Sequence, residues 1–420
     1  MSVFVKATAS RSRSLKSILG GVAIVGASAL VLTGCAAPAA DTETSAGPRE
    51  PLTLKIGTIL PQSGTLAFLG PPEEAGVALA VKEVNEADLG ITVEVEYRDS
   101  GDTTTDTATV SVTDLLSLGV SAIVGAASSG VSKTVIDQIT GAGVVQFSPA
   151  NTSIDFTDYA DDGLYWRTAP SDVLQGEVLG NLIAEDGIEA LGIIELNDSY
   201  GTGLAAKLKE TYEAAGGSVV AESLFNTGDT VFTTQISEVL AANPDGVALV
   251  TFDEAKVIVP ALRGAGYAGP LYFVDGNLAD YTADFAAGAL TGSKGTLPGL
   301  DTATLGDFTD RLLEIDPSLT DFSYAAESYD AVVLLALAAL AANSTDGADI
   351  ASKLQEVSGG TGDGDKATDF ASAAQIIIDG GVVDYDGYSG PVTFDENGDP
   401  TEATIGIYEY KDDNTYERIN

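Results

Sequence analysis

The sequence predicts an α/β protein with two doubly wound parallel-sheet lobes joined by a hinge. Strand-like and helix-like segments alternate from residue 52 onward, and the same alternation starts again after residue 168. Two loops of small residues also follow directly on buried strands. Strands that alternate with helices form parallel sheets covered on both faces. The 420 residues suffice for two lobes, each of about 150 to 200 residues.

The first set of elements contains short, β-branched apolar runs that suit strands buried on both faces. Between them lie segments with apolar residues at helical spacing. The expected strands are residues 52–60, 91–99, 122–124 and 144–147, and the expected helices are 73–84, 107–118 and a helix from 131 onward.

The second set repeats this order, with no short-period repeat that would indicate a solenoid. The expected helices are 172–185, 203–215, 233–241 and 253–264, and the expected strands are 190–196, 218–225, 245–252 and 271–275. Two further helices are expected at 308–314 and 324–342, then a Gly/Asp-rich loop, and the chain ends with the run 392–394, a turn at 396–399 and a strand at 403–410.

Two loops follow the last two strands of the first set. In the first loop, Gly125 to Gly130 permits a tight turn, and Ser128 and Ser129 stand where a helix N-cap belongs. The free N–H groups of the next helical turn suit an anion such as a carboxylate. The second loop, residues 148–152, offers hydroxyls and an amide, and opens into the same crevice if the two strands are neighbours. The alternative is that both are ordinary capped turns.

The N-terminus has the pattern of a secretory signal peptide over residues 1–34, with a basic leader followed by an apolar stretch. Cys35, the single cysteine, follows Leu-Thr-Gly, which resembles the lipobox of bacterial lipoprotein precursors; the alternative is a chance cysteine. Residues 35–51 read as a flexible tether. We therefore expect an exported protein, lipid-anchored to the outer face of the cytoplasmic membrane, with no later membrane span.

The charge and composition exclude several classes of function. The leader holds four of the 20 basic residues, so the exported chain would carry 16 basic against 62 acidic residues, a net charge of −46, and we expect no nucleic-acid partner. The chain has no histidine, which excludes Ser-His-Asp and Cys-His sites and most catalytic zinc sites. We expect no enzyme, no cofactor and no bound metal. The acidic clusters at Asp363, Asp365 and 395–399 lack the spacing of a known calcium loop and are expected to be turns.

Ligands of open parallel sheets bind outside the carboxyl ends of the strands. The residues expected there supply hydroxyls and backbone donors for an anion, one carboxylate for a cation, and aromatic rings for an apolar body. A zwitterion needs that combination. These residues are Ser63, Gly64, Ser128, Ser129, Ala150 to Thr152, Tyr200, Phe252 and Asp275.

Eight motifs occur in order along residues 52–410: KIGTILPQSG, YRDSGD, IVGAASSG, FSPANTS, YWRTAPSD, NDSYGTG, ESYDAV and GYSGPVTFDENGD. Together they resemble the type I periplasmic binding proteins of the leucine, isoleucine and valine binding family, the solute receptors of ABC importers. The resemblance implies a small amino-acid-like ligand, ABC permease and ATPase subunits as partners, and a monomer.

The resemblance also implies roles for individual residues. The ligand carboxylate would be held by the hydroxyl of Ser129 and by backbone N–H groups near Thr152. The ammonium would be held by the carbonyl of Ala150, the hydroxyl of Thr152 and the carboxylate of Asp275. The family often has glutamate at this last position, and the shorter aspartate requires a deeper ammonium or a bridging water.

Two aromatic residues of the second lobe, Tyr200 and Phe252, would close over the ligand. Leu69 stands where the family can have a tyrosine. The remaining residues near the expected side-chain pocket are Ser128, Asn151 and Tyr324. Because they are more polar than an aliphatic ligand needs, we expect an amino acid of branched-chain type or a more polar relative.

The expected N-terminal lobe comprises residues 52–168 and 299–387, and the C-terminal lobe residues 169–298 and 388–420. Hinge segments are expected near 165–171, 294–300 and 385–391. Closure about this hinge would trap the ligand, and a permease would then bind the closed form. The alternative is a ligand-sensing receptor domain for an amide or urea-like solute coupled to signalling. A carboxylate-based hydrolase is less favoured.

Overall fold

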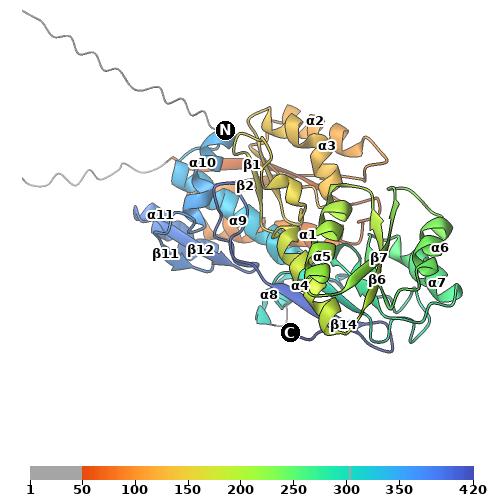
Figure 1. The fold of residues 1–420 in the computed structure, drawn as a ribbon. Coiled ribbons are helices and arrows are strands. Elements are labelled where there is room, and N and C mark those ends of the chain that lie inside the picture. The colour runs from red at the N-terminus through yellow and green to blue at the C-terminus, as the bar shows by residue number, and fades with distance from the viewer. Residues whose placement is uncertain (1–49, 302–303) are drawn as a thin grey trace, which may run out of the picture. The chain divides into compact units, whose positions relative to one another are not determined.

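The computed structural model describes residues 50–301 and 304–420. The expected signal peptide, Cys35 and nearly all of the expected tether lie outside these residues. Pro48–Asn420 forms one unit of the chain, with two large sheets and helices packed against them (Figure 1). The predicted α/β class with two parallel-sheet lobes is confirmed.

The first sheet is entirely parallel and has the order β2-β1-β3-β4-β5. Its strands are β1 (Leu52–Leu60), β2 (Ile91–Asp99), β3 (Ala122–Gly125), β4 (Val145–Ser148) and β5 (Tyr165–Arg167). The first four are the strands predicted from the sequence, whereas the edge strand β5 was not assigned. β3 and β4 are neighbours, so the loops that follow them lie at the same edge of the sheet.

Helices cover both faces of this sheet (Figure 1). Ile56 and Ile59 of β1 are an odd number of residues apart and therefore point to opposite faces. The Ile56 face packs against α1 (Gly70–Ala87), α8 (Phe308–Ile315), α9 (Ala325–Ala342), α10 (Gly347–Val357) and α11 (Phe370–Ile378). The Ile59 face packs against α2 (Thr107–Ser117) and α3 (Ser129–Thr140). At Gly57 a Cβ would lie 2.6 Å from Leu115 Cδ1, so glycine allows α2 its close approach.

Helix α9 is long and apolar enough to cross a membrane, with 18 residues and a mean hydropathy of 1.6. By length and composition α9 is therefore a candidate span, whereas the sequence predicted no later membrane span. However, 89% of the helix is buried, and it packs against α1, α10 and α11. A helix that is apolar on all sides is also typical of a protein core.

The second sheet has the order β15-β14-β10-β9-β8-β6-β7. Its strands are β6 (Ala190–Leu196), β7 (Ser218–Phe225), β8 (Gly246–Val250), β9 (Leu271–Phe273), β10 (Lys294–Pro298), β14 (Ile405–Tyr410) and β15 (Tyr416–Arg418). The first five are parallel, and β14 pairs antiparallel with β10 and β15. The helices that share its core are α4 (Asp172–Glu185), α5 (Ser199–Ala214), α6 (Thr233–Ala241) and α7 (Ala255–Gly264).

The prediction of a Gly/Asp-rich loop after residue 342 was wrong. This segment forms α10 and α11 and a small sheet of β11 (Asp365–Ala367), β12 (Val383–Gly387) and β13 (Gly390–Pro391). Two of its aspartates are N-caps: the side chain of Asp346 accepts a hydrogen bond from Ala348 N, and that of Asp369 from Ser372 N. In the run 392–394, Phe394 makes an isolated bridge to Pro400.

The chain passes between the two sheets three times: after β5, after β10 and before β14. Val392 and Phe394 are buried in the core of the first sheet. Their position favours a third crossing later than the predicted boundary at residue 388. The other predicted lobe boundaries remain predictions.

Candidate functional site

The loops that follow β3 and β4 are joined by hydrogen bonds at the carboxyl edge of the first sheet. Ser128 caps α3, its Oγ accepting a hydrogen bond from Val131 N at 3.3 Å. The Oγ of Ser129 accepts one from Ser153 N, also at 3.3 Å, which connects the first loop to the second. The predicted shared crevice therefore exists, and the first turn of α3 lies beside it.

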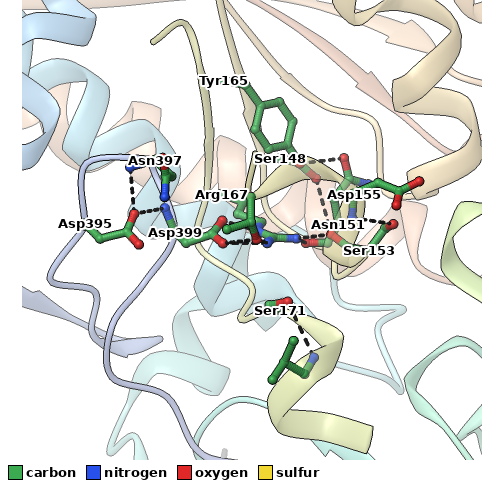
Figure 2. Close-up of polar contacts among 12 residues, drawn as sticks. Ser148, Asn151, Ser153, Asp155, Tyr165, Arg167, Ser171, Asp395, Asn397 and Asp399 are labelled. Carbon is green, nitrogen blue, oxygen red and sulfur yellow. Dashed lines mark hydrogen bonds and ion pairs between the residues drawn. The ribbon is translucent and has the colours of Figure 1, made fainter. Parts of the chain in front are cut away.

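Asn151 holds the second loop against the first and does not point into the crevice. Its Nδ2 donates to the carbonyls of Ala126 (3.0 Å) and Ala127 (2.7 Å), and its Oδ1 accepts from the hydroxyl of Tyr165 (3.0 Å). Ser148 Oγ, in turn, accepts from Asn151 N at 2.9 Å and donates to Ala126 O at 2.7 Å. Figure 2 shows this arrangement of Ser148, Asn151 and Tyr165. The role predicted for Asn151 in the side-chain pocket thus has no support in its position.

Arg167 supports the second loop from behind (Figure 2). Its fully buried guanidinium donates from Nη1 to Ser153 O (2.8 Å) and Asn151 O (3.3 Å), the carbonyls on either side of Thr152. The same guanidinium forms a two-bonded ion pair with Asp399. Burial by itself would lower the pKa of Arg167, but the hydrogen bonds and charge of Asp399 raise it overall. The sequence indicated Arg167 only as part of the expected hinge segment 165–171.

Asp399 belongs to the acidic turn that the sequence predicted at residues 396–399. Asp395 Oδ1 accepts hydrogen bonds from the backbone N–H groups of Asn397 (2.8 Å) and Asp399 (3.1 Å), which closes the turn (Figure 2). In the part of the chain that the structure describes, no group of three or more acidic, histidine or cysteine side chains is placed to hold a metal ion.

The second lobe contributes a buried carboxylate, Asp275, at the start of the short 3-10 helix Asp275–Asn277 after β9. The hydroxyl of Tyr200, in the first turn of α5, donates to Asp275 Oδ1 at 2.7 Å. The hydroxyl of Tyr324, at the N-cap of α9, donates to Asp275 Oδ2 at 2.8 Å. The ring of Tyr200 stacks on Phe252 with centroids 5.2 Å apart. Tyr324 therefore lies at the carboxylate and not only beside the expected side-chain pocket.

These residues surround a cavity with an empty volume of about 240 Å³ between elements of both sheets. It contains eight of the ten ligand-binding residues predicted from sequence, together with Leu66, Ala127 and Gly276. The eight are Leu69, Ser128, Ser129, Ala150, Tyr200, Phe252, Asp275 and Tyr324. Asn151 and Thr152 are not among the lining residues. The structure thus brings together hydroxyls, a helix N-terminus, aromatic rings and a carboxylate that are far apart in the sequence.

Sequence reasoning missed Asp172, the first residue of α4. Asp172 is fully buried and neither carboxyl oxygen has a hydrogen-bond partner among the described residues, nor does the buried hydroxyl of Thr152. Asp172 N donates to Thr152 O at 2.7 Å, so the two residues are adjacent. An aspartate in the first turn of a helix usually interacts with the helix dipole, and this local pattern concealed its burial.

The site is strongly acidic inside. Burial raises the pKa of Asp172 well above its ordinary value, and the charge of Asp275 raises it further, while the nearby Thr152 hydroxyl acts in the opposite direction. Burial also raises the pKa of Asp275, partly offset by the hydrogen bonds from Tyr200 and Tyr324. No lysine or arginine is among the described residues that line the cavity. Such a site can accept a cationic group of a ligand, since buried carboxylates are stable only when paired.

Comparison with known proteins gives a family match over most of the chain. The model of the family described as periplasmic binding protein matches residues 53–413. Leu/Ile/Val-binding protein homolog 1 of Brucella suis is 28% identical over 311 residues, 72% of this chain and 82% of that protein. The leucine-, isoleucine-, valine-, threonine-, and alanine-binding protein of Pseudomonas aeruginosa is 26% identical over 378 residues, 86% of this chain and 91% of that protein.

Solved structures match at the level of the fold. A leucine binding protein from Thermotoga maritima has a TM-score of 0.72 at 21% identity, covering 87% of this chain and 98% of its own. The substrate binding protein of a branched-chain amino acid transporter from Streptococcus pneumoniae, solved with isoleucine, has a TM-score of 0.71 at 24% identity, covering 87% and 99%. A solute binding protein from R. palustris, solved with benzoate, has a TM-score of 0.70 at 20% identity, covering 87% and 95%.

Proposed function

The chain belongs to the periplasmic binding protein family, and we propose that it captures a small amino acid by closure of two lobes. The family match confirms the expectation of a solute-binding protein and not an enzyme. The observation that carries the proposal is the cavity itself, which has hydroxyls and a helix N-terminus at one end and the buried carboxylate of Asp275 at the other.

We infer the orientation of the ligand from these two ends. The first turn of α3, with Ser128 and Ser129, presents N–H groups and hydroxyls, which suit a carboxylate. Asp275, with Asp172 behind it, suits an ammonium because the charge of the ligand would offset the cost of burying carboxylates. The rings of Tyr200 and Phe252 supply the apolar wall.

Contacts between the two lobes support the closure mechanism. The hydroxyl of Tyr324, at the start of α9, donates to Asp275 of the second lobe at 2.8 Å. Ser153 Oγ, in the loop after β4, donates to Ser199 O at the start of α5 at 2.8 Å. These bonds form only when the lobes are together, so a ligand that adds contacts to both lobes shifts the population toward the closed form.

We propose that the ligand is an aliphatic amino acid or a more polar relative such as threonine. The cavity is narrow, which favours a small ligand. The polar residues Ser128 and Tyr324 line it and can bond a polar tail. The Pseudomonas aeruginosa relative, whose name includes both threonine and alanine, supports this range.

We further propose that the protein acts outside the cytoplasm as the monomeric, Cys35-anchored receptor of an ABC importer, with permease and ATPase subunits as partners. The family is one of extracytoplasmic binding proteins, which supports the location. A sensing role is the second candidate. It is supported by the similarity to the chemotactic signal transduction system substrate-binding protein BasB of Halobacterium salinarum, 25% identical over 356 residues, 82% of this chain and 83% of that protein. Neighbouring permease and ATPase genes would favour transport, and a signalling gene would favour sensing.

Titration calorimetry of the purified protein tests the proposed ligand class. Leucine, isoleucine, valine, alanine and threonine are titrated first, followed by the other amino acids and by amides and urea-like solutes. A ligand present at 100 times its Kd should also stabilise the fold by about 2.7 kcal/mol in a thermal-shift assay. Binding of an amide or a urea-like solute in place of every amino acid would contradict the proposal.

A further inference from the structure

A second cavity, with an empty volume of about 620 Å³, lies on the other side of Tyr324. We call it the hinge cavity because its walls come from the crossing segment at the end of β10, from residues 320–327 and from the strands β14 and β15. Among the residues that the structure describes, Tyr324 alone lines both this cavity and the one described above. The two cavities are therefore separate sites with one shared wall.

The hinge cavity contains a buried carboxylate without a partner. Glu327, in the first turn of α9, is 5% exposed, and its carboxyl makes no hydrogen bond or ion pair with another residue of the described chain. The one contact from Thr168 goes to the backbone carbonyl of Glu327 (3.0 Å). At Gly299, whose φ is +110°, a Cβ would lie 2.8 Å from Glu327 Oε1. Glycine at 299 thus leaves room for the carboxyl group.

Glu327 is also accessible from a smaller neighbouring hollow, with an empty volume of about 260 Å³, that is lined by Gly299 and Pro391 among others. Burial, with a smaller contribution from the charge of Asp330, raises the pKa of Glu327 to about 8. A buried carboxylate with no cation beside it is costly, and this cost is what raises its pKa. A cationic ligand would remove the cost.

A second acidic residue, Asp321, and a set of apolar and aromatic residues also line the hinge cavity. Asp321 uses Oδ1 to accept hydrogen bonds from Ser323 N (2.8 Å) and Ser323 Oγ (2.7 Å), and burial raises its pKa. The edge-to-face rings of Tyr408 and Tyr416, with centroids 5.5 Å apart, form one wall. The remaining apolar lining is provided by Leu297, Pro298, Leu300, Leu305, Phe322 and Ala326.

No lysine or arginine lines the hinge cavity among the described residues. Arg418 contacts one lining residue of the cavity: its guanidinium donates to Gly299 O (3.2 Å) and to Asn420 Oδ1 (3.1 Å). Arg418 forms no ion pair with Glu327 or Asp321 among the described residues. The two acids therefore line a cavity in which a cation of matching shape can neutralise them.

We propose that the hinge cavity is a second binding site, for a small organic amine with an apolar or aromatic body. The ammonium would pair with the carboxylate of Glu327, where its hydrogen bonds are charge-assisted, and the charge of Asp321 in the same cavity would attract it further. The body would pack against Tyr408 and Tyr416, which can also attract a cation through their ring faces. The site differs from the amino-acid cavity in needing no donor for a ligand carboxylate.

Calorimetry and thermal shift at pH 8 test the site with phenethylamine as the probe and uncharged 2-phenylethanol as its matched control. We expect phenethylamine to bind and raise the melting temperature, and 2-phenylethanol to do neither. Glu327→Gln keeps the shape of the side chain and should weaken phenethylamine binding by about tenfold or more. Asp321→Asn is the second variant and should weaken it in the same direction.

The variant Asp275→Asn shows which cavity binds the amine, because it removes the carboxylate of the amino-acid cavity and leaves the hinge cavity unchanged in sequence. Phenethylamine should bind this variant as it binds the unmodified protein. Loss of binding in Asp275→Asn with retention in Glu327→Gln would place the amine in the amino-acid cavity and overturn the proposal. Absence of binding to the unmodified protein, or equal binding of 2-phenylethanol, would overturn it as well. Titration of Glu327→Gln with amino acids tests the proposed function separately, because Glu327 does not line the amino-acid cavity.

Discussion

Arg167 and Asp399, 232 residues apart in the sequence, form a buried ion pair with two hydrogen bonds, Nε to Oδ1 at 2.6 Å and Nη2 to Oδ2 at 2.8 Å (Figure 2). The Arg167 side chain is 0% exposed and that of Asp399 is 11% exposed. Because Arg167 also holds the carbonyls that flank Thr152, the pair connects the ligand-side loop to the chain just before its third crossing. The loop geometry and the hinge are thus mechanically linked.

Removing one partner of this pair should destabilise the protein strongly. Asp399→Asn leaves the guanidinium buried with fewer charge partners, and we expect a loss of about 3 to 5 kcal/mol in the free energy of unfolding. Chemical denaturation measures it. The double variant Arg167→Met/Asp399→Leu should recover much of the stability, since an apolar pair can replace a buried ion pair. Its ligand affinity should stay low, because nothing then holds the carbonyls beside Thr152. Full recovery of affinity would show that Arg167 has no positioning role.

Asp275→Asn should abolish most ligand binding while the protein stays folded. The amide keeps the size of the side chain but loses the charge that would face an ammonium, a change worth about 2 to 5 kcal/mol for a buried charge pair. Calorimetry measures the affinity, and circular dichroism checks the fold. The exposed Asp284 provides a matched control, and Asp284→Asn should bind normally. Equal affinity of Asp275→Asn and the unmodified protein would exclude the ammonium role.

Tyr324→Phe and Tyr200→Phe separate binding from closure. Each removes one hydroxyl donor to Asp275, which should cost about 1 kcal/mol of ligand affinity, roughly fivefold. Only the Tyr324 bond crosses between the lobes. Small-angle X-ray scattering of the ligand-free protein should therefore show a larger radius of gyration for Tyr324→Phe than for Tyr200→Phe. Identical scattering of both variants would contradict the inter-lobe role of Tyr324.

Gly130→Leu should hold the lobes apart. Gly130 lies in the first turn of α3, and a Cβ there would lie 2.7 Å from Oδ2 of Asp198, the N-cap of α5 in the second lobe. We expect a folded protein that opens in scattering and binds ligand at least about tenfold more weakly. Gly264→Leu is the control, because no atom lies within 4 Å of a Cβ at that glycine. Normal affinity of Gly130→Leu would mean that the two loops do not meet in the bound form.

Glu327 should make the stability depend on pH. Burial raises its pKa from 4.5 to about 8, so the folded state binds a proton that the unfolded state releases over this range. Its contribution to stability is full below about pH 4.5 and is lost as the pH rises toward 8. Glu327→Gln should remove this loss, a difference of up to about 4 kcal/mol between pH 5 and pH 8. Chemical denaturation at both pH values measures the free energy of unfolding of the two proteins. An equal change with pH in both proteins would contradict the raised pKa of Glu327.

The sequence by itself determined the alternation of elements and many of their limits. The predicted strands 52–60, 91–99, 190–196 and 218–225 and the predicted helices 172–185 and 233–241 agree with β1, β2, β6, β7, α4 and α6 to the residue. Hydrophobic periodicity and N-caps are local signals, and burial on both faces of a parallel sheet leaves a continuous apolar run. The same signals failed in the Gly/Asp-rich segment, where the caps Asp346 and Asp369 of α10 and α11 were taken for loop residues.

The candidate site shows where local signals end. Loops of small and hydroxyl-bearing residues at strand ends indicated Ser128, Ser129 and Ala150, because sheet topology places such loops together. Only the tertiary structure decided that the side chain of Asn151 turns toward the first loop, that Asp172 is buried without a partner, and that Arg167 and Asp399 meet. Each of these contacts joins segments that are brought together by strand order and by the three crossings. The sequence of one segment does not indicate which distant segment it contacts, or how deeply that contact buries its residues.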